Sequence, residues 1–194
     1  DDLHVLRAAV AYQRGNFGKS IVIGRDDDVK HKLETAGLGD AVSELEVMNA
    51  AKTEHLDTYK AYLYERLQRQ GYDQADVHRL AARDRHVFAA LMLAHGHGDG
   101  MVTGATRKST HVMDHINYVF DAKAEDGAVG VTALLHNGRI VLVADTLVHE
   151  WPSDEDLADI AIRAAGVARS LGIEPRVAFA SFSNFGYPIS ERAE

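Results

Sequence analysis

The most informative absence in this 194-residue sequence is cysteine, of which there is none. Without thiols the chain can form no disulfide, use no thiolate nucleophile and offer no cysteine ligand to zinc. Positive charge is also scarce, because 21 Lys and Arg stand against 29 Asp and Glu, for a formal net charge of −8. Nucleic acids and anionic membranes attract basic surfaces, so this balance argues against either partner.

Long apolar runs are missing as well. No stretch approaches the roughly 20 residues of a membrane span, and no signal-like segment stands at the start, so we expect a cytoplasmic protein. Residue 1 is Asp rather than Met, and a helical pattern starts at once. At the other end, a helix expected from Ile189 stops within two turns. These ends predict that the chain is a piece of a longer polypeptide.

Hydrophobic residues make up 46% of the chain, which is ordinary for a globular protein with a sizeable core. Apolar residues at helical spacing alternate with short apolar runs, which is the pattern of an α/β fold. The expected helices are Leu3 to about Gln13, Val29–Ala36, Thr53–Gln70, Asp73–Ala82, Arg85–His95, Ser109–Phe120 and Asp154–Ser170. The expected strands are Ile21–Ile23, Leu45–Met48, Met101–Thr103, Ala128–Leu135, Ile140–Ala144 and Val177–Ala180.

Two local signals fix details of this fold. The Asn137-Gly138 pair between two expected strands is a strong hairpin signal, so the sheet should be mixed, mostly parallel with one antiparallel pair. Ser153 precedes a helix whose first turn holds Glu155 and Asp156, which is the pattern of an N-cap followed by acidic residues that favour the helix dipole.

The first candidate site is the glycine-rich segment 99–106 and the helix that follows it. Arg107 and Lys108 come next, and then Ser109 and Thr110, either of which is a candidate N-cap. A helix N-terminus preceded by two cations suits a phosphate group. The segment lacks the spacing of a dinucleotide fingerprint or a Walker loop. A tight strand-to-helix turn with exposed cations is the plainer interpretation.

The second candidate site is the segment 172–186, where an expected strand ends in hydroxyl and amide groups. Ligands of open α/β sheets bind beyond the carboxyl ends of strands, so Ser181, Ser183 and Asn184 are candidate contacts for a phosphate or a small acyl group. The same residues also suit a turn or a helix cap. Asp145 ends another expected strand, where it could orient a substrate or act as a base, or could cap a loop.

His111 and His115 lie one helical turn apart, with Asp114 between them, and His95 and His97 lie beside Asp99. Helical histidine pairs bind zinc only when a third ligand reaches the same point, and the spacing implies none. With 11 histidines in the chain, chance pairs are common, so the sequence predicts no metal site. No nucleophile elbow is present, and a serine hydrolase finds no support.

Three blocks together resemble the phosphate acetyl/butyryltransferase family. They are residues 99–105 (DGMVTGA), residues 143–146 (VADT) with the acidic helix after Pro152, and residues 172–186 (GIEPRVAFASFSNFG). Within the family, the last block and residues 86–90 (HVFAA) are most similar to the C-terminal phosphotransacetylase-like domain of bacterial NADP-dependent malic enzymes.

The resemblance implies α/β/α layers in two lobes around a cleft that binds coenzyme A and acyl phosphate. The first lobe would span about residues 1–100, without its C-terminal return, and the second about 101–194. Such domains commonly dimerise, and a malic enzyme would form a larger homo-oligomer. The implied ligand-binding residues are Thr103, Gly104, Arg107, Lys108, Ser109, Thr110, Asp145, Ser181, Ser183, Asn184 and Gly186.

Two departures from the family's pattern bear on activity. Active transacetylases carry a basic residue where this sequence has Phe185, and an arginine at the position that aligns with His115. Acyl transfer between phosphate and a thiol needs fixed positive charge, and losing one such donor costs ~10²–10³ in rate. The sequence therefore predicts a binding site for an acyl-CoA without catalytic residues of its own.

The expected function is that of a regulatory and oligomerisation domain with acetyl-CoA as effector and no cofactor in the domain itself. NADP, a divalent metal and malate decarboxylation would belong to a separate malic-enzyme domain. An active transferase that uses Arg107 or Lys108, and a purely structural dimerisation module, are the alternatives.

Overall fold

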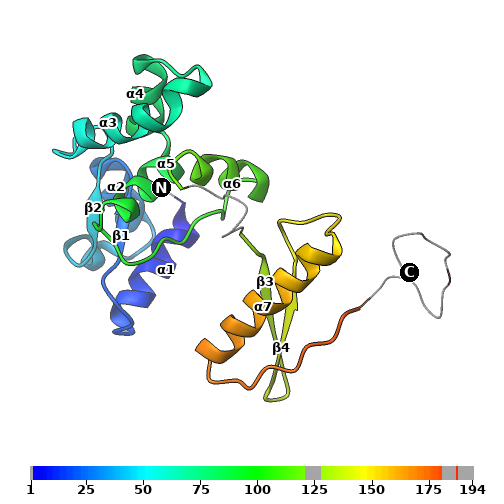
Figure 1. Cartoon of the computed structure of the whole chain (residues 1–194). Coiled ribbons are helices and arrows are strands. Elements are labelled where there is room, and N and C mark those ends of the chain that lie inside the picture. The colour runs from blue at the N-terminus through cyan, green and yellow to red at the C-terminus, as the bar shows by residue number, and fades with distance from the viewer. Residues whose placement is uncertain (1, 121–127, 181–186, 188–194) are drawn as a thin grey trace. The chain divides into compact units, whose positions relative to one another are not determined.

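The computed structural model describes residues 2–120, 128–180 and 187, and the chain divides into two compact units, Asp1–Ala122 and Lys123–Glu194 (Figure 1). The lobe boundary expected near residue 100 stays a prediction. The first unit contains α1 (Leu3–Arg14), β1 (Ile21–Ile23), α2 (Asp26–Thr35), the 3-10 turn η1 (Gly39–Ser43), β2 (Glu46–Met48), α3 (Leu56–Leu67), η2 (Gln68–Gln70), α4 (Gln74–Arg83), α5 (Arg85–Ala94) and α6 (Ser109–Asn117).

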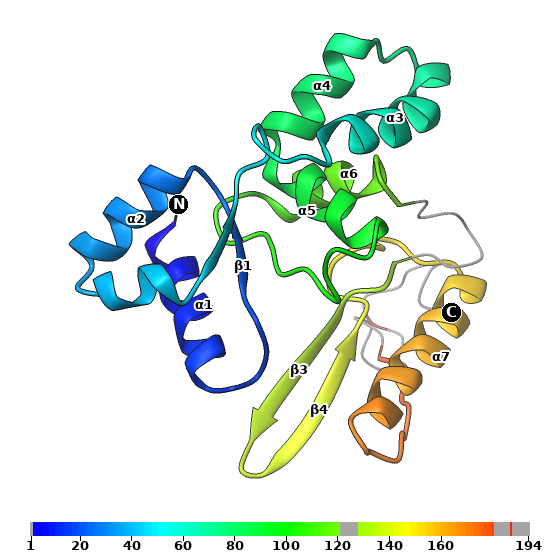
Figure 2. The ribbon, with the colours of Figure 1, turned by 90° about the vertical axis from the view of Figure 1, so that its left-hand side faces the viewer.

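The first sheet is a parallel pair in which β1 and β2 are joined through α2, with Val22 opposite Val47. Side chains alternate between the faces of a strand, and here both faces are covered. Val22 and Val47 pack into a core with α1 and α2, which lie beside β1 (Figure 2). Ile21, Ile23 and Met48 pack on the opposite side. Helices therefore cover both faces of this small sheet.

The larger core of the first unit lies among α3, α4 and α5. Tyr59 and Leu63 from α3, with Phe88 and Leu91 from α5, are almost completely buried. The chain after α6 returns to this core, because Val119 is also buried in it. α6 is thereby held against α5, and this contact positions the candidate site.

The second unit contains β3 (Val131–His136), β4 (Arg139–Ala144) and α7 (Asp154–Ser170). The two strands form an antiparallel hairpin with Leu135 opposite Ile140. Asn137 and Gly138 have φ values of 47° and 74°, the left-handed backbone that a tight two-residue hairpin turn requires. The hairpin predicted at this pair is confirmed.

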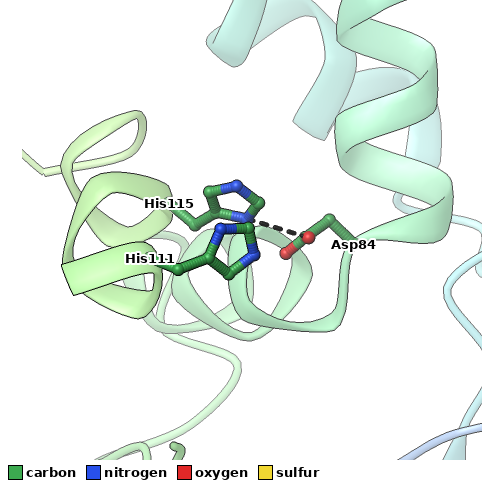
Figure 3. A group of neighbouring side chains, drawn as sticks. All are labelled: Asp84, His111 and His115. Carbon is green, nitrogen blue, oxygen red and sulfur yellow. Dashed lines mark ion pairs between the residues drawn. The ribbon is translucent and has the colours of Figure 1, made fainter. Parts of the chain in front are cut away.

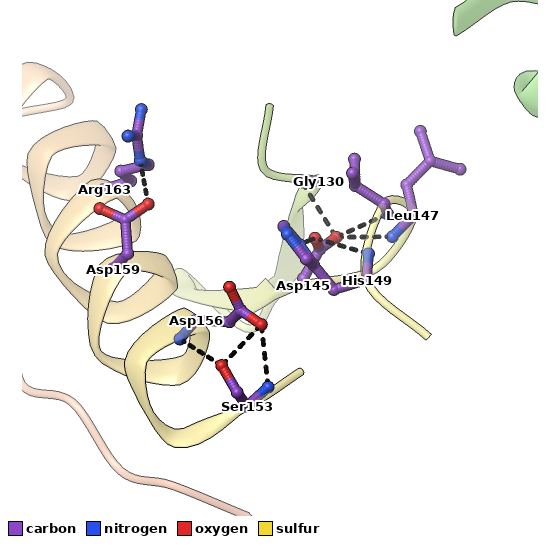
Figure 4. A network of polar contacts seen from close by, with 9 residues as sticks. Gly130, Asp145, Leu147, His149, Ser153, Asp156, Asp159 and Arg163 are labelled. Atoms are coloured by element: carbon purple, nitrogen blue, oxygen red, sulfur yellow. Dashed lines mark hydrogen bonds and ion pairs between the residues drawn. The ribbon is translucent and has the colours of Figure 1, made fainter. Parts of the chain in front are cut away.

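The predicted cap of α7 is also confirmed. The backbone N–H of Asp156 donates to the Ser153 hydroxyl, and the backbone N–H of Ser153 donates to the Asp156 carboxylate, which completes a capping box (Figure 4). Asp154, Glu155 and Asp156 occupy the first turn, where the helix dipole favours negative charge.

Two predicted strands are wrong. Met101–Thr103 and Val177–Ala180 are extended segments without ladder hydrogen bonds. A strand needs a partner as well as apolar residues, and no strand in the described part of the chain pairs with either segment. Val102 is accordingly fully exposed and Phe179 is 68% exposed, whereas Met101 packs against the larger core.

The α/β class is confirmed, and in the described residues the strands form two separate pairs, one parallel and one antiparallel. Among these residues there is no helix with both the length and the apolar character needed to cross a membrane.

Candidate functional site

The loop before α6 is the part of the predicted phosphate site that the structure describes. Gly104 has a φ of +106°, which favours glycine, and the backbone N–H of Arg107 donates to its carbonyl at 3.5 Å. The N-cap of α6 is Lys108, so the N-caps predicted at Ser109 or Thr110 are wrong, and both residues lie in the first turn. A threonine or serine in the cap would have bonded the helix's own N–H groups.

No side chain caps α6, because the Lys108 side chain is a donor and accepts nothing. The first N–H groups of a helix have no partner within the helix, and an anion can accept from them. Arg107 and Lys108 are exposed, and in the described part of the chain neither side chain forms an ion pair. The local geometry therefore suits a phosphate group.

Thr103, at the start of this loop, is held by a residue that the sequence did not single out. A hydrogen bond of 2.5 Å joins its hydroxyl oxygen to Nδ1 of His86 on α5. Burial lowers the pKa of His86 below its ordinary value, and although Asp84 acts in the opposite direction, the net shift is downward. The positive charge of Arg107 contributes to that lowering. His86 is consequently neutral at pH 7 and positions the loop without adding charge.

His115, one of the two departures expected from the family resemblance, lies half-buried on α6 against the start of α5. Its Nδ1 is 2.8 Å from Oδ2 of Asp84 (Figure 3). Burial alone would raise the pKa of Asp84, but the backbone N–H of Val87 and the His115 ring lower it, and the net pKa lies below its ordinary value. Asp84 is therefore a carboxylate at neutral pH.

Asp145, in the second unit, caps a loop, which is one of the roles that the sequence left open for it. Its Oδ1 accepts from the backbone N–H groups of Gly130, Leu147 and Val148, at 3.0, 2.7 and 3.0 Å. Its Oδ2 accepts from the backbone N–H of His149 at 3.1 Å and lies 2.6 Å from Nδ1 of that ring (Figure 4). The carboxylate is 2% exposed and fixes the loop after β4. A role for it in ligand binding stays a prediction.

The electrostatics of Asp145 follow from these contacts. Burial of the carboxylate would raise its pKa, but the backbone N–H groups of Leu147 and Val148 and the His149 ring outweigh that effect. The pKa lies well below the ordinary value of 3.8. A base with so low a pKa accepts protons poorly at neutral pH, so this carboxylate is unsuited to general-base catalysis.

The predicted contacts Ser181, Ser183, Asn184 and Gly186 lie outside the described residues, and their roles stay predictions. The structure brings Thr103, Gly104, Arg107 and Lys108 together in the loop before α6. Sequence reasoning missed His86 and Asp84. The sequence could have identified Asp84 as the N-cap of α5, because it directly precedes an apolar helix. Nothing in the sequence places Asp84 beside α6.

All of the chain, residues 1–194, matches the phosphate acetyl/butaryl transferase family. The chain belongs to this family. Membership agrees with the three sequence blocks that resemble this family.

Relatives within the family are of two kinds. The NADP-dependent malic enzyme of Rhizobium meliloti (strain 1021) is 41% identical over 194 residues, which cover 100% of this chain and 26% of that protein. The phosphate acetyltransferase of Thermoanaerobacterium thermosaccharolyticum is 28% identical over 192 residues, which cover 93% of this chain and 56% of that protein. This chain therefore spans about a quarter of the malic-enzyme relative and about half of the transferase.

A solved structure supports the fold. EutD phosphotransacetylase from Staphylococcus aureus matches with a TM-score of 0.82 and 24% identity, over 98% of this chain and 57% of that chain. This likeness confirms the predicted transacetylase-like α/β fold, and the malic-enzyme relatives confirm the narrower resemblance seen in the sequence.

Proposed function

We propose that this chain is the regulatory and oligomerisation domain of an NADP-dependent malic enzyme, and that it binds acetyl-CoA or a related acyl-CoA without transferring the acyl group. The malic-enzyme relative, of which the chain spans 26%, supports the parent enzyme. NADP, the divalent metal of decarboxylation and the reaction of malate would then belong to another part of the parent chain. The domain itself would need no cofactor.

The ligand proposal rests on the loop before α6, where positive charge meets a helix N-terminus that has no side-chain cap. Coenzyme A carries several phosphate groups, and this loop offers the exposed cations Arg107 and Lys108 beside a helix N-terminus without a side-chain cap. In this proposal Thr103 and Gly104 form the part of the loop that lies next to the bound phosphate. Ser109 and Thr110 contribute N–H groups and hydroxyls from the first turn of α6. Ser181, Ser183, Asn184 and Gly186, which the sequence analysis proposes as contacts, would act on the acyl end of the ligand.

The absence of turnover is supported by two residues. His115, whose ring lies beside Asp84, replaces the arginine of active relatives, and Phe185 replaces their basic residue. An active transferase remains a second candidate because transferases are among the relatives. In that case Arg107 or Lys108 would supply the missing charge.

Removing the two loop cations should weaken ligand binding. We expect the double variant Arg107→Ala/Lys108→Ala to bind acetyl-CoA at least about 100-fold more weakly, because hydrogen bonds to charged groups contribute about 1.5–3 kcal/mol each. Calorimetric titration of the 194-residue chain measures the change. Arg7→Ala/Lys30→Ala removes the same number of charges from exposed positions on α1 and α2 and should bind as wild type. Equal loss in both variants, or no saturable heat in wild type, would contradict the proposal.

The hairpin supports the proposed dimer. Leu134, Val141 and Val143 point to one face of β3 and β4, and they are 53%, 56% and 42% exposed. A contiguous exposed apolar face marks a protein contact, and a second copy of this chain is the partner we propose.

A charge on that face should separate the dimer. We expect Val141→Asp to convert a dimer to a monomer in light scattering coupled to gel filtration, because an unpaired carboxylate would be buried at the interface. Ile162→Asp on α7, at an apolar position that is 69% exposed, serves as the matched control and should stay dimeric. A wild-type monomer, or a Val141→Asp dimer, would refute this assignment.

A further inference from the structure

Three metal-ligating side chains meet between α5 and α6. Asp84 precedes α5, while His111 and His115 lie on α6 (Figure 3). One ligand atom from each residue lies within 4.8 Å of the other two. The histidine pair that the sequence showed without a third ligand therefore has one, supplied by a different helix.

The two histidines are presented by helix geometry. Residues four apart lie on the same helix face, and the two ring centroids are 4.0 Å apart. His111 is exposed, so an ion can enter from solvent. His115 is half-buried and fixed.

Asp84 is oriented by its role as the N-cap of α5. Its Oδ1 accepts from the backbone N–H groups of His86 and Val87, at 2.9 and 3.0 Å. Its Oδ2 is thereby turned toward His115 at 2.8 Å. One oxygen caps the helix and the other remains for a ligand, so the carboxylate can bind an ion and keep its capping contacts.

One nitrogen of the His115 ring is buried without a hydrogen bond. Its Nδ1 is buried, and despite the short distance to Asp84 it has no hydrogen-bond partner of acceptable geometry. A buried polar atom without a partner costs free energy. An ion bound to both Nδ1 and the carboxylate would satisfy the nitrogen lone pair and neutralise the charge of Asp84.

The donor set selects the class of metal. Two imidazole nitrogens and one carboxylate oxygen suit zinc and its first-row neighbours, whereas magnesium and calcium take oxygen ligands. Ligand atoms around tetrahedral zinc lie about 3.3 Å apart. The pair formed by His115 and Asp84, at 2.8 Å, must therefore open slightly, and the exposed His111 must approach. His86 is a neighbour rather than a ligand, because its Nδ1 is bonded to Thr103 and its ring centroid is 6.3 Å from that of His115.

We propose that Asp84, His111 and His115 bind a divalent transition-metal ion, of which Zn²⁺ is the best match. Three protein ligands leave a fourth position for water or an anion. The site joins the start of α5 to α6, and thus fixes the helix whose N-terminus follows Arg107 and Lys108. This inference does not depend on acyl-CoA binding, and either can fail while the other stands.

The experiment titrates Zn²⁺ into the chelator-treated 194-residue chain and follows binding by calorimetry, with Co²⁺ absorption as a second readout. We expect one ion per chain. His111→Ala should weaken binding by at least about 10-fold, since even outer-shell partners of a metal contribute 10- to 100-fold. Because His111 is exposed, this variant keeps the fold, which circular dichroism verifies.

Two further variants make the test specific. Asp84→Asn keeps a good N-cap for α5 but lacks the negative charge, and it should weaken Zn²⁺ binding by at least about 10-fold. His31→Ala removes an exposed histidine of α2 and should bind Zn²⁺ as wild type. The proposal is overturned if wild type binds no stoichiometric Zn²⁺, or if His111→Ala and Asp84→Asn bind it as tightly as wild type.

Discussion

Mixed with acetyl phosphate and coenzyme A, the chain is expected to form acetyl-CoA at least about 10⁴-fold more slowly than an active phosphotransacetylase, because the proposed function leaves it without two cations, each contributing ~10²–10³ in rate. The family resemblance implies these cations at the positions that His115 and Phe185 occupy. The His115 ring lies against the Asp84 carboxylate, so it does not replace a guanidinium directed at a developing oxyanion. A spectrophotometric assay of thioester formation measures the rate.

The same assay separates the two candidate functions. If the chain is an active transferase, turnover approaches that of active relatives and is lost on Arg107→Ala. Lys30→Ala, an exposed cation on α2, is the matched control and should change nothing in either case. Sustained turnover that depends on Arg107 would favour an active transferase over a regulatory domain without turnover.

The largest expected effect on stability is that of Asp145→Ala, which should destabilise the second unit by about 3 kcal/mol. The variant leaves four backbone N–H groups around a buried position without their acceptor, and unpaired buried donors cost about 1–3 kcal/mol each where water does not replace the partner. Urea unfolding followed by fluorescence of Trp151, the single tryptophan, measures the loss in this unit.

Two companion variants control this experiment. Asp159→Ala removes a carboxylate that pairs with Arg163 on the surface of α7, and it should cost under about 1 kcal/mol. Gly130→Ala should destabilise the same loop as Asp145→Ala, because a Cβ there would lie 2.7 Å from Oδ1 of Asp145. Equal stabilities of wild type and Asp145→Ala would show that the loop does not need its carboxylate cap.

The contribution of Asp145 depends on pH in a definite direction. Since its folded pKa is depressed, the stabilisation is fully present above the ordinary value of 3.8 and is lost as the pH falls below that value toward the folded pKa. The difference in the free energy of unfolding between wild type and Asp145→Asn should therefore be constant from about pH 5 to about pH 7. It should shrink only at lower pH. Urea unfolding across this range provides the measurement.

Features set by a few neighbouring residues could be predicted from the sequence. The turn at Asn137-Gly138 and the cap at Ser153 depend only on local backbone chemistry, and both were found where expected. The segment Met101–Thr103 was mispredicted because its apolar character is local, whereas a strand also needs a partner that the sequence does not name.

The candidate site divides in the same way. Arg107 and Lys108 follow a glycine-rich segment and precede a helix, so the loop could be recognised from order alone. The contacts of His86 with Thr103 and of His115 with Asp84 could not, because they arise where α5 and α6 pack together. Packing between helices depends on the whole core. The spacing of residues along the chain therefore does not predict that Asp84, the N-cap of α5, lies beside His115.

The proposal that this domain regulates a malic enzyme by binding an acyl-CoA is tested most directly in a malic enzyme that contains this chain. The measurement is malate oxidation with and without acetyl-CoA, in wild type and in Arg107→Ala/Lys108→Ala. We predict a change of about 5-fold or more in wild type, a typical coupling between allosteric sites, and no response in the double variant. Malate oxidation that is the same with and without acetyl-CoA in wild type would contradict the account.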